Sequence, residues 1–211
     1  MSNLIVFDLD DTLYKEIDFL KSAYLAISNI LDLDNEILYD YMIKCYFEKK
    51  DVFELLSKKY LITKSELLGI YRNHKPVTLP TEINIKRVLN SFKKKGNFLG
   101  LITDGRSLTQ RNKLVSLEIE KLFDLIIISD EFGSEKPCEK NYLMFERFEV
   151  DRRFYIGDNP NKDFLTPNKL GWTTICLLDN GKNIHKQNFS LPSEYLPHIK
   201  IKNLFELDQI L

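Results

Sequence analysis

The chain has 211 residues, of which 44% are hydrophobic and 29% charged, and its formal net charge is -1. This length is sufficient for one domain with a hydrophobic core plus a modest insertion, and the composition excludes a disordered or low-complexity protein. Acidic residues are interleaved with the short lysine runs, which argues against a nucleic-acid-binding face.

The first predicted element is a buried strand over Leu4–Phe7, a short apolar run that leads directly into Asp8-Leu9-Asp10-Asp11-Thr12. Residues two apart in an extended segment share a side, so Asp8, Asp10 and Thr12 are expected to converge on one cavity. Carboxylates this close require a divalent cation or a proton between them. The alternative interpretation is that these acids cap the following helix.

A helical insertion is predicted after this strand, because about ninety residues precede the next strand and a simple crossover needs far fewer. From Glu16 to about Pro80 apolar residues recur at helical spacing, and Pro76–Pro80 predicts an extended linker. We therefore expect a helical cap over residues 15–80 and a core formed by residues 1–14 and 81–211. Seven aromatic residues of the cap are expected to pack in its interior rather than to stack on a nucleobase: Tyr24, Tyr39, Tyr41, Tyr46, Phe47, Tyr60 and Tyr71.

The rest of the chain alternates between predicted strands and helices, which is typical of an α/β fold with a doubly wound parallel sheet. A loop is expected over Lys182–Pro197, with a final short helix near Leu204–Ile210. The other predicted strands are Phe98–Thr103, Leu125–Ser129, Arg153–Gly157 and Thr173–Leu177, and the other predicted helices are Ile83–Lys95, Leu108–Leu117 and Asn141–Phe148.

Two of these strands are followed by residues suited to binding phosphate. Thr103-Asp104-Gly105-Arg106 offers a hydroxyl and turn amides, although the same residues serve equally well in an ordinary turn. Lys136, followed by Pro137, could neutralise a phosphoryl group, but a lysine in such a loop is more often simply solvated.

The fourth strand ends at Gly157-Asp158, and Asp163 follows five residues after Asp158. Because the carboxyl ends of parallel strands share one edge of a sheet, these acids are expected near the first pair. Carboxylate oxygens are ligands that Mg²⁺ prefers, whereas the alternative role is a helix N-cap.

Taken together in this order, the four segments resemble the motifs of haloacid dehalogenase-like hydrolases. A connecting stretch, with Gln110 and Lys113 after Thr103-Asp104-Gly105 and then Leu122-Phe123-Asp124, looks like that of phosphatases and nucleotidases with helical, C1-type caps. The matching motifs are Asp8-x-Asp10-x-Thr12, Thr103, Lys136-Pro137 and Gly157-Asp158-x4-Asp163.

This resemblance implies a magnesium-dependent phosphatase that hydrolyses a phosphate monoester of a small metabolite through an aspartyl phosphate. Asp8 would be the nucleophile, and Asp10 would protonate the leaving alcohol and later activate water. Thr103, the amide of Asp104, and Lys136 would bind the phosphoryl group.

The metal, Mg²⁺, would be held by Asp8, Asp158 and the backbone carbonyl of Asp10. Supporting roles would fall to Thr12, which would orient the Asp10 loop, and to Asp163, which would hold Lys136 or a magnesium-bound water.

Three other functions compete with this interpretation. A phosphomutase of the same superfamily would use the same phosphorylated aspartate. A 2-haloacid dehalogenase is less favoured, because halide needs no acid and Asp10 would be idle. A non-catalytic phosphorylation switch or binding protein is disfavoured by the helical insertion and by the complete set of chemical residues.

Location and specificity can be predicted only in outline. Cys45, Cys138 and Cys176 lack metal-ligand spacing and fit a reducing compartment, and with no signal-peptide or membrane segment we expect a cytoplasmic protein. The expected partner is a small phosphorylated metabolite, not nucleic acid or membrane, and no oligomeric state is indicated. Candidate substrate-contacting residues are Tyr14, Arg106, Arg72, His74 and Lys75.

Overall fold

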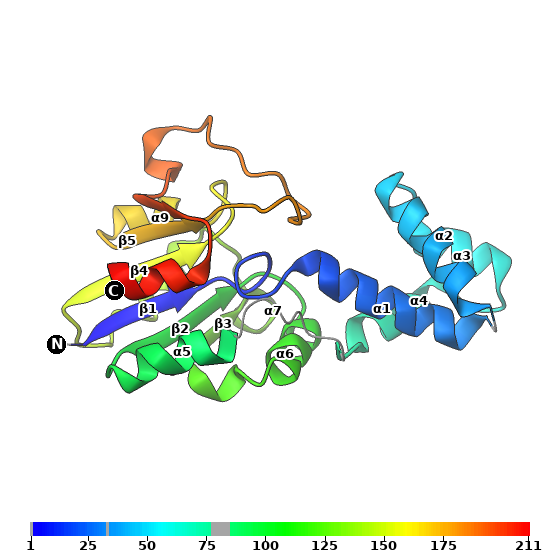
Figure 1. Cartoon of the computed structure of the whole chain (residues 1–211), viewed down its shortest axis with the longest axis horizontal. Helices are drawn as coiled ribbons and strands as arrows, with labels where there is room; N and C mark the ends of the chain where they lie inside the picture. The colour runs from blue at the N-terminus through cyan, green and yellow to red at the C-terminus, as the bar shows by residue number, and fades with distance from the viewer. Residues whose placement is uncertain (1, 33, 77–84) are drawn as a thin grey trace.

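The centre of the computed structural model, which describes residues 2–32, 34–76 and 85–211, is a six-stranded sheet. Its order is β3-β2-β1-β4-β5-β6, and every neighbouring pair is parallel (Figure 1). This confirms the predicted parallel α/β sheet. The strands are β1 (Asn3–Phe7), β2 (Phe98–Thr103), β3 (Leu125–Ile128), β4 (Arg152–Gly157), β5 (Thr173–Leu177) and β6 (Ile199–Ile201).

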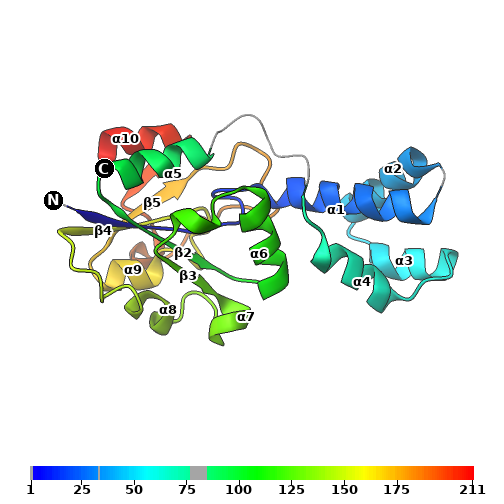
Figure 2. The same cartoon turned by 90° about the horizontal axis from the view of Figure 1, so that it is seen from below.

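Helices cover both faces of the sheet, with α5 and α10 on one side and α8 and α9 on the other (Figure 2). The central strand β1 has a continuously apolar sequence because both of its faces are buried. Ile5 and Phe7 belong to the first hydrophobic core, whereas Leu4 and Val6 belong to the second. The helices after β1 and the cap are α5 (Ile85–Lys94), α6 (Ser107–Ser116), α7 (Ser129–Phe132), α8 (Glu139–Leu143), α9 (Leu165–Lys169) and α10 (Leu207–Ile210).

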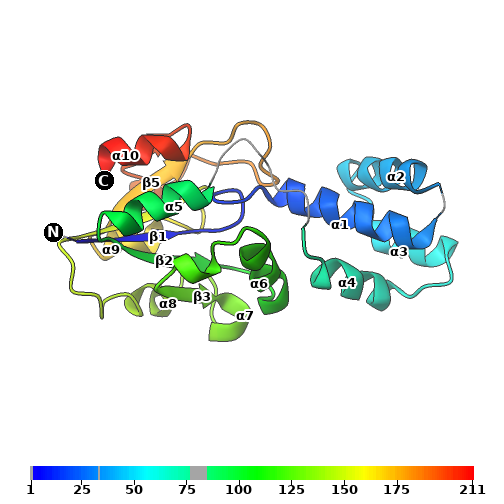
Figure 3. The ribbon, with the colours of Figure 1, turned by 60° about the horizontal axis from the view of Figure 1, so that its bottom comes forward.

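Between β1 and α5, the residues that the structure describes include four helices, which form a lobe beyond the carboxyl ends of the strands that we call the cap (Figures 1 and 3). The cap has its own hydrophobic core, in which the ring of Tyr24 makes edge contacts with Tyr46, Phe53 and Tyr71. Residues 77–80 of the predicted linker lie outside the described residues, and the exact domain boundaries stay a prediction. The cap helices are α1 (Glu16–Leu31), α2 (Asn35–Phe47), α3 (Val52–Lys59) and α4 (Lys64–Asn73).

Several local predictions differ from the structure. Helix α9 was not expected, and the predicted loop over Lys182–Pro197 contains a 3-10 helix at Ser193–Tyr195. The short strand β6 was not expected, because three residues give too short a pattern to recognise. The helix expected to run to Phe148 ends at Leu143, after which hydrogen bonds such as Phe145 N to Tyr142 O span three residues. The third strand ends at Ile128, and Ser129 begins α7.

No helix in the described part of the chain is long and apolar enough to cross a membrane.

Candidate active site

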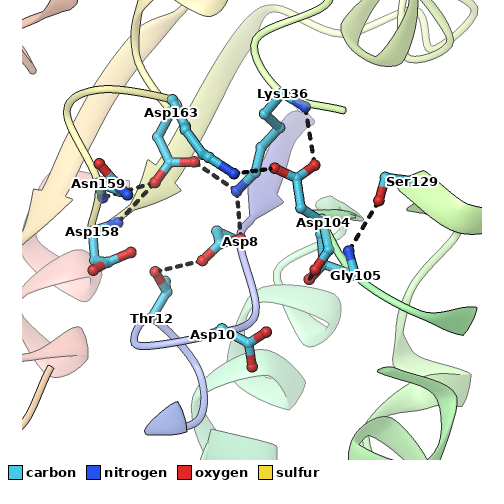
Figure 4. A network of polar contacts seen from close by, with 12 residues as sticks. Asp8, Asp10, Thr12, Asp104, Gly105, Ser129, Lys136, Asp158, Asn159 and Asp163 are labelled. Carbon is cyan, nitrogen blue, oxygen red and sulfur yellow. Dashed lines mark hydrogen bonds and ion pairs between the residues drawn. The ribbon is translucent and has the colours of Figure 1, made fainter. Parts of the chain in front are cut away.

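Asp8 lies at the carboxyl end of β1, where its backbone N–H still donates to Ile156 O at 2.8 Å. The chain then turns, and Asp11 adopts a left-handed conformation with φ of 58°. The Asp8 side chain is buried, and its two oxygens have different partners (Figure 4). Oδ1 accepts from Lys136 Nζ at 2.5 Å, and Oδ2 accepts from Thr12 Oγ1 at 3.2 Å. Thr12 is therefore a hydrogen-bond partner of the Asp8 side chain in the structure.

Lys136 is the buried cation of the site. Its Nζ donates to Asp8 Oδ1 and, at 2.7 Å, to Asp163 Oδ1. Burial alone would lower the pKa of this amine, but the carboxylates of Asp163 and Asp8 outweigh burial and raise the pKa well above its usual range. The ammonium is thus charged at all physiological pH values.

Asp163 uses both of its carboxylate oxygens within the protein. Oδ1 accepts from Lys136 Nζ and from Tyr155 OH, the latter at 3.2 Å. Oδ2 accepts from the backbone N–H groups of Asp158 at 3.1 Å and Asn159 at 2.8 Å. With four donors already bound, this carboxylate is suited to holding its neighbours in place rather than to binding a ligand.

Gly157 makes the close approach of Asp163 feasible. A Cβ atom at position 157 would lie 2.5 Å from Asp163 Oδ2, which is inside van der Waals contact. Glycine is required here for lack of space, a role that its position at a strand end alone does not reveal.

The negative charge of this region exceeds the positive charge that Lys136 provides. Carboxylate oxygens of Asp8, Asp158 and Asp163 lie within 4.8 Å of one another, and all three residues are buried. Burial, followed by the charges of Asp163 and Asp8, raises the pKa of Asp158 to about 9. For Asp8, burial raises the pKa to about 7, and Lys136 counteracts part of this effect. A buried excess of carboxylates is stabilised by a bound cation.

The donor atoms present fit Mg²⁺. They are hard carboxylate oxygens. Each oxygen of Asp163 already accepts two hydrogen bonds, whereas the two oxygens of Asp8 and Oδ2 of Asp158 accept one each, which leaves Asp8 and Asp158 with lone pairs to hold a metal. The Asp158 carboxylate accepts a hydrogen bond from a neutral group, because Asn183 Nδ2 donates to its Oδ2 at 2.8 Å.

Asp10 faces the same cavity but has partners of its own. Lys113 Nζ donates to Asp10 Oδ1 at 2.5 Å, and Gln110 Nε2 donates to Oδ2 at 2.8 Å. Sequence reasoning gave these two residues of α6 no role. The sequence does contain one indication of their contact with a common partner, because a glutamine and a lysine three residues apart lie on the same side of a helix.

The residues expected to bind phosphate lie around the same opening. Thr103 is buried, and its Oγ1 accepts from Gln110 Nε2 at 2.6 Å. The Asp104 carboxylate accepts from the backbone N–H of Lys136 at 2.9 Å and from Lys162 Nζ at 3.0 Å, so it fixes the Lys136 loop. The cavity has a volume of about 280 Å³ and is lined by Asp8, Asp10, Asp11, Glu16, Thr103, Asp104, Gly105, Glu135, Lys136, Asp158, Asn159, Lys162, Asp163 and His185. Of the predicted site residues, Thr12 alone does not line it.

The loop after β5 also reaches the site, which the sequence did not predict. The Nδ2 atom of Asn183 donates to Asp158 Oδ2. The Oδ1 atom of the same amide accepts from Lys15 Nζ at 2.5 Å. Gln187 Nε2 donates to the carbonyl oxygen of Asp158 at 2.7 Å. This loop has no periodic pattern, so nothing in the sequence indicated where its amides would lie.

The candidate substrate-contacting residues lie elsewhere. Tyr14 is 2% exposed in the first hydrophobic core, and the Arg106 side chain is 66% exposed beside Asp130. His74 ends the cap, and its Nε2 is 2.7 Å from Ser22 Oγ. None of the predicted contacts (Tyr14, Arg106, Arg72, His74 and Lys75) is among the residues that line the cavity.

Comparisons with known proteins agree in family and fold. A family model described as "Haloacid dehalogenase-like hydrolase" matches residues 5–177. A glyceraldehyde 3-phosphate phosphatase from Methanocaldococcus jannaschii is 31% identical over 197 residues, covering 82% of this chain and 84% of the relative. One of the same name from Methanothermobacter thermautotrophicus is 32% identical over 197 residues, with 84% and 86% covered.

Among solved structures, the HAD-hydrolase YfnB from Bacillus subtilis bound to magnesium has a TM-score of 0.69 and 22% identity. The alignment covers 100% of this chain and 98% of that one. At this identity the likeness concerns the fold alone.

Proposed function

Since this chain belongs to the haloacid dehalogenase-like hydrolase family and is a phosphatase within it, we propose that it hydrolyses a phosphate monoester of a small metabolite, with Mg²⁺ and a covalent phosphate on Asp8. The observation that carries the proposal is the position of the Lys136 ammonium. It bridges Asp8 and Asp163, with an Asp158 oxygen within 4.8 Å of theirs. A nucleophile, a fixed cation and an oxygen-ligand set thereby meet at one edge of the sheet.

In the first half of the reaction, the Asp8 carboxylate attacks phosphorus and forms a new oxygen–phosphorus bond. The bond from phosphorus to the ester oxygen breaks, and Asp10 supplies the proton to the leaving alcohol. Lys136 favours ionised Asp8 and offsets the negative charge of the phosphoryl oxygens, while Thr103 and the amide of Asp104 orient them.

In the second half, Asp10 takes a proton from water as the water oxygen attacks phosphorus. The bond between Asp8 and phosphorus breaks, and inorganic phosphate leaves with the Asp8 carboxylate regenerated. When bound by Asp8, Asp158 and the backbone carbonyl of Asp10, Mg²⁺ supplies positive charge beside the transferring phosphoryl group. Asp163 holds Lys136 in place, and Thr12 holds Asp8.

The first substrate to test is glyceraldehyde 3-phosphate. The two archaeal relatives are named for it, and a cavity of about 280 Å³ suits a small phosphorylated metabolite. The cap lies beyond this edge of the sheet, where it would exclude water and select among substrates (Figure 3).

Phosphate release tests the proposal. The purified protein is incubated with glyceraldehyde 3-phosphate, other sugar phosphates, nucleoside monophosphates and an aryl phosphate, each with Mg²⁺ and then with excess chelator. We expect release that needs Mg²⁺ and differs among substrates. Release that is unchanged by the chelator would contradict the role of the metal, and conversion of a sugar phosphate to its isomer without phosphate release would indicate a phosphomutase instead.

A further inference from the structure

Helix α6 presents two buried polar side chains to Asp10, although neither belongs to the four sequence motifs. Gln110 is 1% exposed and Lys113 is 3% exposed. Residues of these types are rarely buried to this extent unless their polar atoms are bonded. Here each of them donates to a different oxygen of the Asp10 carboxylate, at 2.8 Å and 2.5 Å respectively.

Gln110 fixes Asp10 relative to the phosphate side of the cavity. Besides Asp10 Oδ2, its Nε2 lies 2.6 Å from Thr103 Oγ1 and 3.1 Å from the carbonyl oxygen of Asp104. A single amide therefore joins the loop after β1 to the loop after β2. The Gln110 side chain thereby links Asp10 directly to the groups expected to hold the phosphoryl oxygens.

Lys113 is held in place from its other side. Its Nζ lies 4.7 Å from the ring centroid of Phe19, a residue of α1 that is 1% exposed. A cation over an aromatic ring is stabilised by the ring's negative face. The ammonium thus lies between the carboxylate of Asp10 and an aromatic ring, and Glu16 adds a further negative charge nearby, so it has little freedom to turn toward solvent.

The same helix is anchored to the end of the cap. Asn112 Nδ2 donates to the carbonyl oxygen of Asn73 at 3.0 Å, and Thr109 Oγ1 donates to that of Arg72 at 3.2 Å. These bonds fix α6 against α4 on one side while Gln110 and Lys113 reach Asp10 on the other. The Asp10 side chain is itself 23% exposed on a loop, so it depends on α6 for its orientation.

We infer that Gln110 and Lys113 are positioning residues that aim the Asp10 carboxylate at the leaving oxygen and at the attacking water. The inference rests on the proposed function, in which Asp10 is the acid and base. Its consequence is a dependence on the leaving group. An alkoxide needs a proton as it departs, whereas a nitrophenolate departs readily without one, so a misplaced Asp10 harms alkyl esters most.

The test compares glyceraldehyde 3-phosphate, an alkyl ester, with para-nitrophenyl phosphate in wild type, Lys113→Met, Gln110→Leu and Lys113→Arg. For Lys113→Met and Gln110→Leu we expect kcat to fall about 100-fold on the alkyl ester and less than about tenfold on the aryl ester. Lys113→Arg keeps the charge and the donors and should recover part of the loss on the alkyl ester.

A double-mutant cycle separates positioning from a general structural role. If Lys113 acts through Asp10, adding Lys113→Met to Asp10→Asn should lower kcat on the alkyl ester by less than about threefold. Val115→Ala, at a position of the same helix that is 50% exposed, is the matched control and should leave the ratio of the two activities unchanged.

Two results would overturn the inference alone: equal losses on both esters in Lys113→Met and Gln110→Leu, or a full Lys113→Met effect in the Asp10→Asn background. A wild-type protein that releases phosphate from neither ester would contradict the proposed function and, with it, the inference.

Discussion

The carboxyl edge of the sheet and the cap differ in what they bury. At the edge of the sheet, five charged residues are no more than 7% exposed: Asp8, Asp158, Asp163, Lys113 and Lys136. In the cap, the interior is formed by apolar and aromatic side chains, and among the described residues of α1–α4 Ser28 alone is a buried polar residue. Burying charge is costly unless it is paired, whereas burying apolar surface stabilises the fold.

Under the proposed function, this difference assigns the reaction to the edge of the sheet and the choice of substrate to the cap. Among the described residues, the buried charged side chains lie around the carboxyl ends of the strands, on the loops that follow them and, for Lys113, on α6. The sheet and its neighbouring elements therefore fix their positions. The cap has its own hydrophobic core, so under the proposed function its outer surface can vary without disturbing Asp8, Asp158 and Asp163. Changes at the edge should therefore act on turnover and, where they leave a buried charge unpaired, on stability as well. Changes within the cap core should act on stability alone.

The largest effect is expected for Asp8→Asn, which removes the nucleophile. Turnover should fall by more than about 1,000-fold, measured as phosphate release at saturating substrate. The melting temperature should stay the same or rise, because burial raises the pKa of Asp8 and an amide avoids burying an ionised carboxyl. Asp130→Asn, on the exposed rim, is the control and should change turnover less than about twofold. More than a tenth of wild-type turnover in Asp8→Asn would show that another group attacks phosphorus.

Lys136→Met should be the variant with the greatest loss of stability. It leaves Asp8 and Asp163 buried without their ammonium, at a cost of about 3–5 kcal/mol in the free energy of unfolding. Urea unfolding in the presence of a chelator measures this directly. Lys162→Met removes a lysine that is 46% exposed beside Asp104 and should cost less than about 1 kcal/mol. Similar losses for the two variants would contradict a special role for the buried pair.

Within the cap, Leu67→Ala should reduce stability and leave the metal site intact. Leu67 is fully buried in the cap core, and its truncation should cost about 2–4 kcal/mol of unfolding free energy. The dissociation constant for Mg²⁺, measured by calorimetric titration, should stay within about twofold of wild type. Leu61→Ala, at a fully exposed position, is the control. A tenfold weaker Mg²⁺ affinity in Leu67→Ala would show that the two regions are coupled.

A smaller effect is expected for Asn183→Ala, which removes the amide that holds Asp158. The affinity for Mg²⁺ should weaken about tenfold, because side chains that orient a metal ligand tune its binding. Calorimetric titration with MgCl₂ measures the change. Asn188→Ala in the same loop should bind Mg²⁺ like the wild type, and an unchanged affinity in Asn183→Ala would remove Asn183 from the metal site.

The same contrast explains what the sequence could predict. Asp8, Thr103 and Asp158 each follow an apolar run directly, and the geometry of a parallel sheet then brings them to one edge. The five predicted strands were recognisable because both faces of the sheet are covered, which makes each strand continuously apolar.

The contacts that could not be predicted from the sequence depend on how the helices, strands and loops pack against one another. The contact of Lys113 with Asp10 requires the rotation of α6 about its axis, and the contact of Asn183 with Asp158 requires the path of an irregular loop. In the cap, periodicity predicted helices with buried aromatic residues, which is wrong for Tyr41 and Phe47 because they are 42% and 64% exposed. Periodicity also did not show which side chains of the cap would reach a substrate.

The most direct test of the central claim is a search for phosphate on Asp8. The enzyme is mixed with substrate and Mg²⁺, quenched in acid within the first turnover, reduced with borohydride, digested and analysed by mass spectrometry. Reduction of an aspartyl phosphate yields homoserine, which we expect at position 8 in the wild type and not in Asp8→Asn. Rapid phosphate release with unmodified aspartate at position 8 throughout the first turnover would contradict the covalent mechanism.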